Sequence, residues 1–195
     1  MLDGADRGGS VRVAKAAVSV AVLGSVLLGG SPAFAATVPS TPAGGSVKLF
    51  ATPSKGLHAT ILMTGAIGDY GNALTIDKNG TPDSNGNYVK VTLHKGGFEI
   101  NSTALNAKTN NLGSQTPINR ATCSMAASVS APVTLLDGTG LYAGITGTLK
   151  LTITEAFILP VYASGKNKGQ CNESQNAQPV ADYGSIIGSG TVSFG

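Results

Sequence analysis

Residues 138–154 read Gly-Thr-Gly-Leu-Tyr-Ala-Gly-Ile-Thr-Gly-Thr-Leu-Lys-Leu-Thr-Ile-Thr. From Leu149 to Thr154, apolar side chains alternate with Lys or Thr, and this period of two is typical of a strand with one buried face. The glycines before it indicate a tight turn, because glycine adopts positive φ angles and lets two backbones approach closely. The stretch therefore predicts a turn that leads into a β-strand, with four structural glycines: Gly138, Gly140, Gly144 and Gly147.

The same glycines match a nucleotide-binding loop poorly. Their spacing, G-x-G-x-x-x-G, is one residue longer than the dinucleotide fingerprint, and no Gly-Lys-Ser/Thr follows. A phosphate loop also opens a helix, whereas Thr148–Thr154 is rich in β-branched residues and favours a strand. Spacing and context therefore argue against a nucleotide site.

Short strands separated by turn residues account for most of the remaining chain. Residues 89–94 and 98–101 alternate as strictly as residues 149–154. Weaker strand candidates are residues 47–52, 57–66, 72–77, 118–127, 133–136, 157–162 and 185–194. No segment beyond residue 35 shows convincing helical periodicity, so no helix is expected there.

About eight to ten short antiparallel strands suggest a closed barrel or a sandwich. Aromatic residues make up 5% of the chain and tryptophan is absent, so an immunoglobulin-type core around a buried Trp has no support. We therefore predict an all-β fold: a single antiparallel β-barrel of about eight strands, preceded by a signal-peptide helix.

Residues 1–35 have the pattern of a signal peptide. A basic start is followed by the apolar run 16–28 and by small residues at Ala33 and Ala35, the arrangement that signal peptidase cleaves. The apolar run is shorter than the roughly 20 residues that cross a bilayer. We expect a secreted, extracellular protein, cleaved after Ala35 and without a stable membrane anchor afterwards.

The remaining chain divides into a flexible N-terminal arm, residues 36–45, and a barrel domain, residues 46–195. The full chain carries a net charge of +3, and removal of the signal peptide leaves a net charge of +2 without runs of one sign. This charge lacks the dense Lys/Arg footprint of nucleic-acid binders, so no nucleic-acid partner is expected.

The two cysteines, Cys123 and Cys171, are expected to form one disulfide in an oxidising compartment. Their spacing, with His58 and His94 remote in sequence, matches no common zinc pattern, so no metal and no cofactor are predicted. Cys171 lies in the polar stretch 164–182, which we interpret as a long loop, and Cys123 lies in a strand candidate. The disulfide would then attach this loop to the barrel wall.

The turn at residues 138–148 resembles the G-G-T-G-x-[YF]-x-G-x-x-G turn of the allene oxide cyclase and dirigent-like β-barrel superfamily. It looks closer still to small secreted bacterial proteins with a related barrel, in which turns similar to Gly65–Gly71 and Leu93–Phe98 also occur. The resemblance extends from about Ser46 to Phe194. It implies an eight-stranded antiparallel barrel with a central cavity, and it transfers no catalytic residue to this chain.

Three residues are candidate ligand contacts. Glu155 continues the apolar face of Leu149 and Ile153, so strict alternation would point it into the barrel, where burial would raise the pKa of its carboxyl. The alternative places Glu155 at a solvated rim. Asp69 and Tyr70, between two glycines, could bind a ligand at a barrel end, or Asp69 could instead bond its own backbone as a turn former.

These features favour a secreted barrel that binds a small hydrophobic molecule, because eight strands enclose room for side chains or for one small ligand. The alternatives are a cyclase- or dirigent-like enzyme, and a structural or interaction protein with a filled barrel. No nucleophile elbow or pair of glycosidase carboxylates is identifiable, so no catalytic residue is assigned.

Overall fold

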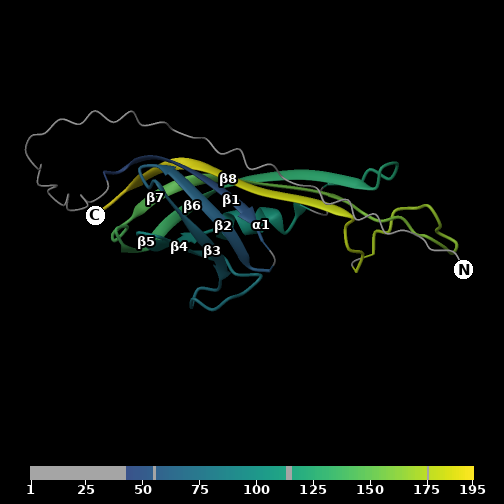
Figure 1. Ribbon diagram of the computed structural model, residues 1–195, viewed down its shortest axis with the longest axis horizontal. Helices are drawn as coiled ribbons and strands as arrows, with labels where there is room; N and C mark the ends of the chain where they lie inside the picture. Colours follow the sequence, from purple (N-terminus) through teal and green to yellow (C-terminus); the bar gives the residue numbers. More distant parts are fainter. Residues whose placement is uncertain (1–42, 55, 113–115, 175) are drawn as a thin grey trace, which may run out of the picture. The chain divides into compact units, whose positions relative to one another are not determined.

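The computed structural model describes residues 43–54, 56–112, 116–174 and 176–195. The predicted signal peptide and most of the predicted N-terminal arm lie outside these residues. The described chain forms eight strands and one short helix (Figure 1). In chain order they are β1 (Gly45–Pro53), β2 (His58–Gly65), β3 (Asp69–Ile76), β4 (Tyr88–Leu93), β5 (Gly96–Asn101), α1 (Thr103–Thr109), β6 (Ser124–Gly140), β7 (Thr146–Ile158) and β8 (Ala181–Ser193).

Each strand pairs antiparallel with its neighbour in the chain, and β1 pairs with β8 to close the barrel. The predicted all-β fold with a closed antiparallel barrel of eight strands is therefore confirmed. The candidates at residues 118–127 and 133–136 are parts of one strand, β6, which begins only at Ser124. The bulge in β5 between Gly97 and Glu99 is the one place where the ladder between β5 and β6 shifts register.

The expectation of no helix beyond residue 35 is wrong, because α1 occupies Thr103–Thr109. This helix is less than two full turns long and buries one residue, Leu105, so its sequence is too short to show a helical period. It is held by packing and by contacts at its ends rather than by propensity: Lys108 Nζ donates to the carbonyl oxygen of Ser130 on β6 at 2.8 Å.

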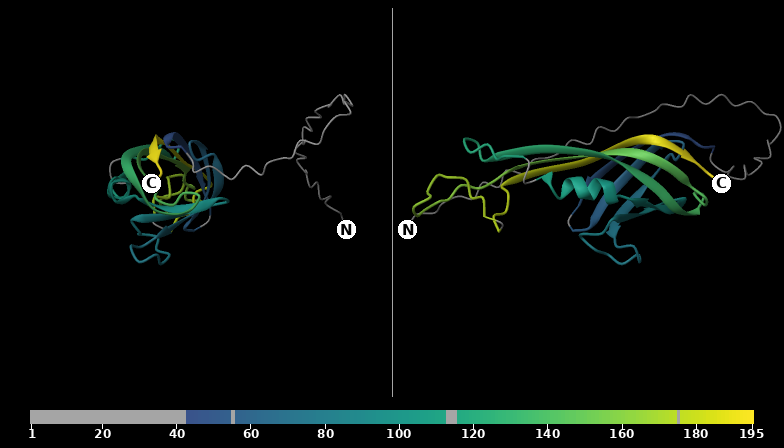
Figure 2. Two further views of the ribbon diagram at one scale, coloured as in Figure 1. Left: turned by 90° about the vertical axis from the view of Figure 1, so that its left-hand side faces the viewer. Right: turned by 180° about the vertical axis from the view of Figure 1, so that it is seen from behind.

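Strands β6, β7 and β8 extend well beyond the closed barrel (Figures 1 and 2). On one side β5 pairs with β6 only as far as Thr134, and on the other β1 pairs with β8 only as far as Ile186. The three long strands continue to pair with each other up to Ser124, Ile158 and Ala181. A three-stranded sheet therefore projects from one end of the barrel.

The two barrel ends differ. The turns at residues 66–68, 94–95 and 141–145 meet at one end, called here the closed end. The projecting sheet and α1 lie at the opposite end, called here the mouth (Figure 2). Large apolar side chains fill the interior from the closed end to the middle, among them Val47, Leu49, Ile61, Met63, Phe98, Leu149 and Tyr142.

Cys123 and Cys171 form the predicted disulfide, across 48 residues of chain. The location differs from the expectation: Cys123 lies in a turn just before β6, with a φ of 53°, and not in a strand. Because β6 begins far out on the projecting sheet, the disulfide ties the loop between β7 and β8 to the end of that sheet and not to the barrel wall. The exposed ion pair between Arg120 and Glu173 (2.9 Å) lies in the same region.

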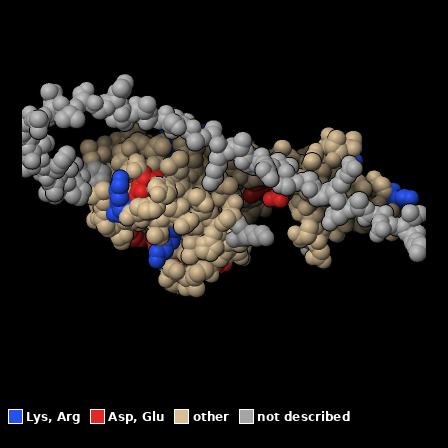
Figure 3. Space-filling model, in the orientation of Figure 1, with Lys and Arg blue, Asp and Glu red and all other residues tan. Residues whose placement is uncertain are grey.

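Charged side chains are sparse on the face shown in Figure 3, and the two signs are mixed without a block of either. Within the part of the chain that the structure describes, no helix is long and apolar enough to cross a membrane.

The glycine-rich stretch forms the turn between β6 and β7 at the closed end. A Cβ atom on Gly138 would overlap the carbonyl oxygen of Tyr142 and lie 2.8 Å from Ile145 Cγ2, so the turn can fold over β6 only without a side chain there. Gly144 adopts a φ of 71°, in the region that glycine favours. Gly140 and Gly147 face neighbouring backbones at similarly short range.

We predict that Gly138→Ala lowers the free energy of unfolding by about 3 kcal/mol or more, because a new methyl group would displace backbone atoms of the turn. Gly184→Ala is the matched control: its Cβ would lie at an ordinary 3.4 Å from Pro53 Cγ, and we expect a change within about 1 kcal/mol. Urea unfolding measures both. Equal stabilities for the two variants would contradict the turn geometry.

Candidate ligand-binding site

An apolar cavity of about 210 Å³ opens at the mouth of the barrel. Its inner side is formed by Leu49, Ile61 and Leu151, which belong to the packed interior. Leu105 and Asn106 of α1 lie on one side of it, and Ile153 of β7 and Ile186 of β8, at the level of the last pair between β1 and β8, on another. Sequence reasoning predicted a cavity from the family resemblance and from the room that eight strands enclose, and it named none of these residues as a ligand contact.

Small side chains explain why the barrel is hollow at this level. β1, β2 and β3 each place an alanine on the cavity wall: Ala51, Ala59 and Ala73. Ala59 and Ala73 are direct cross-strand partners, so two neighbouring strands lack bulk at the same height. Eight strands leave an interior that ordinary side chains just fill, and alanines at these positions leave part of it empty.

A glycine on β8 determines the depth of the cavity. A Cβ on Gly188 would overlap Leu151 Cδ2 and lie 3.4 Å from Leu49 Cβ, so the absent side chain makes room for these two leucines inside the barrel. Leu49 and Leu151 then form the wall toward the closed end. The cavity therefore lies at the mouth and does not run the length of the barrel.

Helix α1 is anchored beside the cavity by polar contacts to the chain before β4. Ser102 Oγ donates to the carbonyl oxygen of Asn87 at 3.0 Å, and Ser102 is 3% exposed. Asn106 Nδ2 donates to the carbonyl oxygen of Gly86 at 2.6 Å and to Asn87 Oδ1 at 3.3 Å. These contacts hold Leu105 and Asn106 at the cavity.

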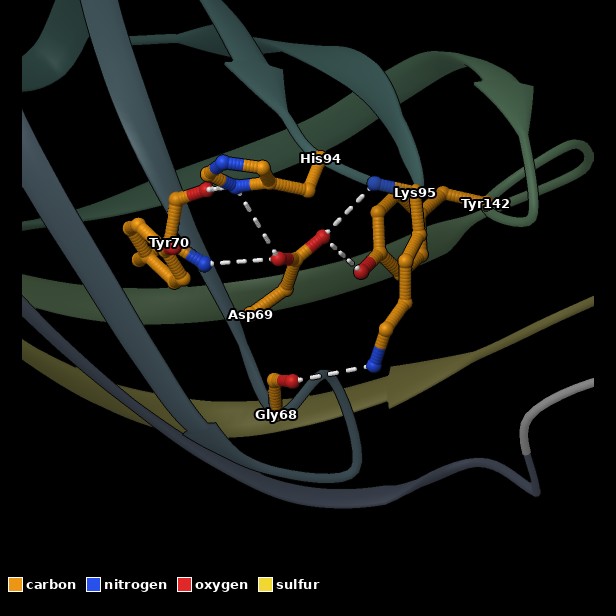
Figure 4. A network of polar contacts seen from close by, with 6 residues as sticks. All are labelled: Gly68, Asp69, Tyr70, His94, Lys95 and Tyr142. Carbon is orange, nitrogen blue, oxygen red and sulfur yellow. Dashed lines mark hydrogen bonds and ion pairs between the residues drawn. The ribbon is translucent and has the colours of Figure 1, made fainter.

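The closed end holds the most connected buried polar group, the carboxylate of Asp69 (Figure 4). Asp69 is 6% exposed, and its oxygens accept hydrogen bonds from the Tyr142 hydroxyl (2.8 Å), the Lys95 backbone N–H (3.0 Å) and its neighbour's backbone N–H at Tyr70 (2.9 Å). His94 Nδ1 lies 3.7 Å from the carboxylate and donates to the carbonyl oxygen of Tyr70 at 2.8 Å.

The environment of Asp69 keeps it charged. Burial acts to raise the pKa of its carboxyl, but the hydrogen bonds from Tyr142, Lys95 and Tyr70, with the Lys95 charge, outweigh burial and lower the pKa below 3.8. Burial, and then the contact with Asp69, raise the pKa of the Tyr142 hydroxyl well above its usual range. The pair is therefore a carboxylate and a neutral phenol. Together with the Lys95 backbone N–H, it joins the start of β3, the turn after β4 and the turn before β7 at the closed end.

The three predicted contact residues do not converge. Asp69 and Tyr70 lie at the closed end, away from the cavity, and the Tyr70 ring is on the outer surface, 58% exposed and 4.1 Å from the His94 ring. Glu155 lies near the opposite end, on the projecting part of β7, paired with Gly184. Because Glu155 is beyond the last pair of β1 with β8, no barrel wall encloses it and it is exposed. Ligand binding by these residues stays a prediction.

Within the described residues no group of three or more His, Cys, Asp or Glu side chains could hold a metal ion. No known protein family, curated protein or solved structure matches this chain. The candidate site therefore depends on geometry alone: a mainly apolar cavity at the mouth, with no Asp, Glu, Lys or Arg among its described lining residues and with the polar residues His58, Thr75, Ser102 and Asn106.

We predict that Tyr142→Phe lowers the free energy of unfolding by about 1.5–3 kcal/mol at neutral pH, because it removes a buried hydrogen bond to a charged group. The charged carboxylate stabilises the fold above the unfolded-state pKa, near 3.8, and this stabilisation is lost as the pH falls through the lower folded-state pKa. In Tyr142→Phe the pKa of Asp69 is lowered less than in the wild type. The difference in the free energy of unfolding between the two proteins should therefore shrink as the pH falls.

Unfolding of the wild type and the variant between pH 2 and pH 7 measures this difference. Tyr70→Phe is the control, because Asp69 contacts the Tyr70 backbone N–H and not the ring, and it should behave as the wild type. A deficit of Tyr142→Phe that is constant across the pH range would show that lost packing, and not the charged hydrogen bond, causes it.

Proposed function

We propose that this protein is exported and binds a small apolar molecule in the cavity at the barrel mouth. The observation that carries the proposal is the 210 Å³ cavity itself, whose wall is made mainly of aliphatic side chains from the strands and α1. Ligand sites are typically apolar hollows with a few polar groups at defined places, and Ser102 and Asn106 are such groups. A filled barrel would lack this space, so the cavity supports binding over a purely structural role.

The size of the cavity limits the ligand. An apolar cavity of about 150 Å³ can hold benzene, so by proportion 210 Å³ accommodates about eight to ten non-hydrogen atoms. This favours a single ring or a short aliphatic chain over a large lipid. No described polar groups converge there in an arrangement that suggests a reaction, so binding is proposed and not a cyclase- or dirigent-like activity.

Export rests on two independent features. Residues 1–35 have the signal-peptide pattern, and the cysteines of the remaining chain are joined in a disulfide, which persists in oxidising compartments. Both support a protein that works outside the reducing cytosol.

We predict that toluene binds saturably to the wild-type protein and that Ala59→Leu abolishes this binding, because a leucine at residue 59 would occupy the cavity. Thr60→Leu is the matched control: residue 60 follows directly and, by the alternation of a strand, faces outward. We expect it to retain wild-type affinity within about twofold. Isothermal titration calorimetry measures all three proteins.

Two results would count against the proposal. Absence of toluene binding by the wild type would mean that the cavity does not accept apolar molecules. Equal binding by the wild type and Ala59→Leu, with Ala59→Leu folded by circular dichroism, would place the bound toluene elsewhere.

We also predict that the protein recovered from the medium of a secreting host begins at Ala36 and carries no free thiol. Intact-mass measurement and N-terminal sequencing test the first point, and alkylation without reductant tests the second. Material that retains residues 1–35 and stays with the cells would contradict export.

A further inference from the structure

We propose that the ligand is a neutral molecule with a hydroxyl group that donates a hydrogen bond to Asn106 Oδ1. This inference rests on the binding function proposed above and deepens it by naming the ligand class. It follows from two properties of the cavity wall: the absence of Asp, Glu, Lys and Arg among its described residues, and the way in which the two polar groups on its α1 side, Ser102 and Asn106, are already engaged.

The first property concerns charge. No Asp, Glu, Lys or Arg is among the described residues that line the cavity. An ionised ligand group would lose its water there without gaining a partner of opposite charge, which is strongly unfavourable in an apolar surrounding. A carboxylate with the same chain should therefore bind much more weakly than a neutral molecule.

The second property concerns protons. The Gly86 carbonyl oxygen can only accept, so the Asn106 amide must present its nitrogen to it, and this fixes which amide atom is which. Both protons of that nitrogen have acceptors, the Gly86 oxygen and Asn87 Oδ1. Any further hydrogen bond from Asn106 to a ligand must therefore be accepted by Oδ1.

Ser102 is engaged in the same way. Its hydroxyl proton goes to the carbonyl oxygen of Asn87, which leaves only the lone pairs of Oγ for a ligand. The two polar residues at the α1 side of the cavity are thus both acceptors. A ligand that donates a proton, such as an alcohol, matches them, whereas an ether or ester of the same shape can only accept and does not. The side chains of His58 and Thr75 also line the cavity, but each can donate or accept and so favours neither class.

The test compares three probes of nearly equal size at pH 8 by isothermal titration calorimetry. 1-Octanol and 1-methoxyheptane are isomers of the same chain length: the alcohol can donate a hydrogen bond, whereas the ether, with its oxygen one position further along the chain, can only accept, and octanoate adds a negative charge. Their size suits a cavity for about eight to ten non-hydrogen atoms. We expect 1-octanol to bind about 3- to 10-fold more tightly than 1-methoxyheptane, and octanoate to bind at least about 100-fold more weakly than 1-octanol.

A variant locates the effect at residue 106. Asn106→Leu keeps a similar side-chain shape and removes the acceptor, so in this variant 1-octanol should bind no more tightly than 1-methoxyheptane. Thr109→Val is the matched control on the same helix, because the Thr109 hydroxyl bonds the Leu105 carbonyl oxygen and does not line the cavity. If Asn106→Leu does not fold, the relative affinity of the wild type for 1-octanol and 1-methoxyheptane still tests whether the ligand must donate a hydrogen bond.

The outcomes separate the two proposals. If neither 1-octanol, 1-methoxyheptane nor toluene binds the wild type, the binding function fails and this inference fails with it. If 1-octanol and 1-methoxyheptane bind with equal affinity, the binding function stands and the inference is overturned. Tighter binding of octanoate than of 1-octanol would also overturn it.

Discussion

The hydrogen bond between the Tyr142 hydroxyl and the Asp69 carboxylate joins residues 73 positions apart in the chain. A buried carboxylate is tolerated only when its oxygens have partners, so the start of β3, the Lys95 backbone after β4 and the turn before β7 must meet at this point. Their meeting closes one end of the barrel. Gly138 allows the turn that carries Tyr142 to fold back over β6. The position of the Tyr142 hydroxyl beside Asp69 therefore depends on the absence of a side chain at residue 138.

One end of the barrel is packed with side chains, and the cavity lies at the opposite end. Tyr142, Phe98 and Met63 fill the interior near the closed end, whereas Ala51, Ala59 and Ala73 leave space at the mouth. Residues of the long strands β7 and β8 and of the short helix α1 border that space without filling it. A barrel with a packed end and a hollow end presents an apolar site at its mouth, and this arrangement links the fold to the proposed binding function.

Local patterns predicted most of the fold. Strict alternation, as at Leu149 and Leu151, marks strands whose apolar face is buried, and a lone pair of cysteines in a chain with a signal-peptide pattern indicated the disulfide. The helix was missed because seven residues carry no helical period. Cys123 was placed in a strand because the apolar residues around it resemble one, although the chain turns there with a positive φ.

The candidate site was less predictable, because it depends on relations between distant residues. The cavity exists where Ala59 and Ala73 face each other, and that register is set by the turn between β2 and β3. The side of the sheet on which Glu155 lies followed from alternation, but its exposure depends on where β1 stops pairing with β8. The position of Asn106 beside the cavity depends on its hydrogen bond to the Gly86 carbonyl oxygen, in the chain before β4, and no sequence pattern indicates this contact.

The central claim, that the barrel is packed at one end and hollow at the other, is tested most directly by xenon binding in a crystal under pressure. Xenon occupies apolar cavities without needing a specific functional group. We expect one strong site at the mouth, in contact with Ala59, Ala73 and Leu105. A site beside Tyr142 at the closed end, or no site within the barrel, would contradict the account.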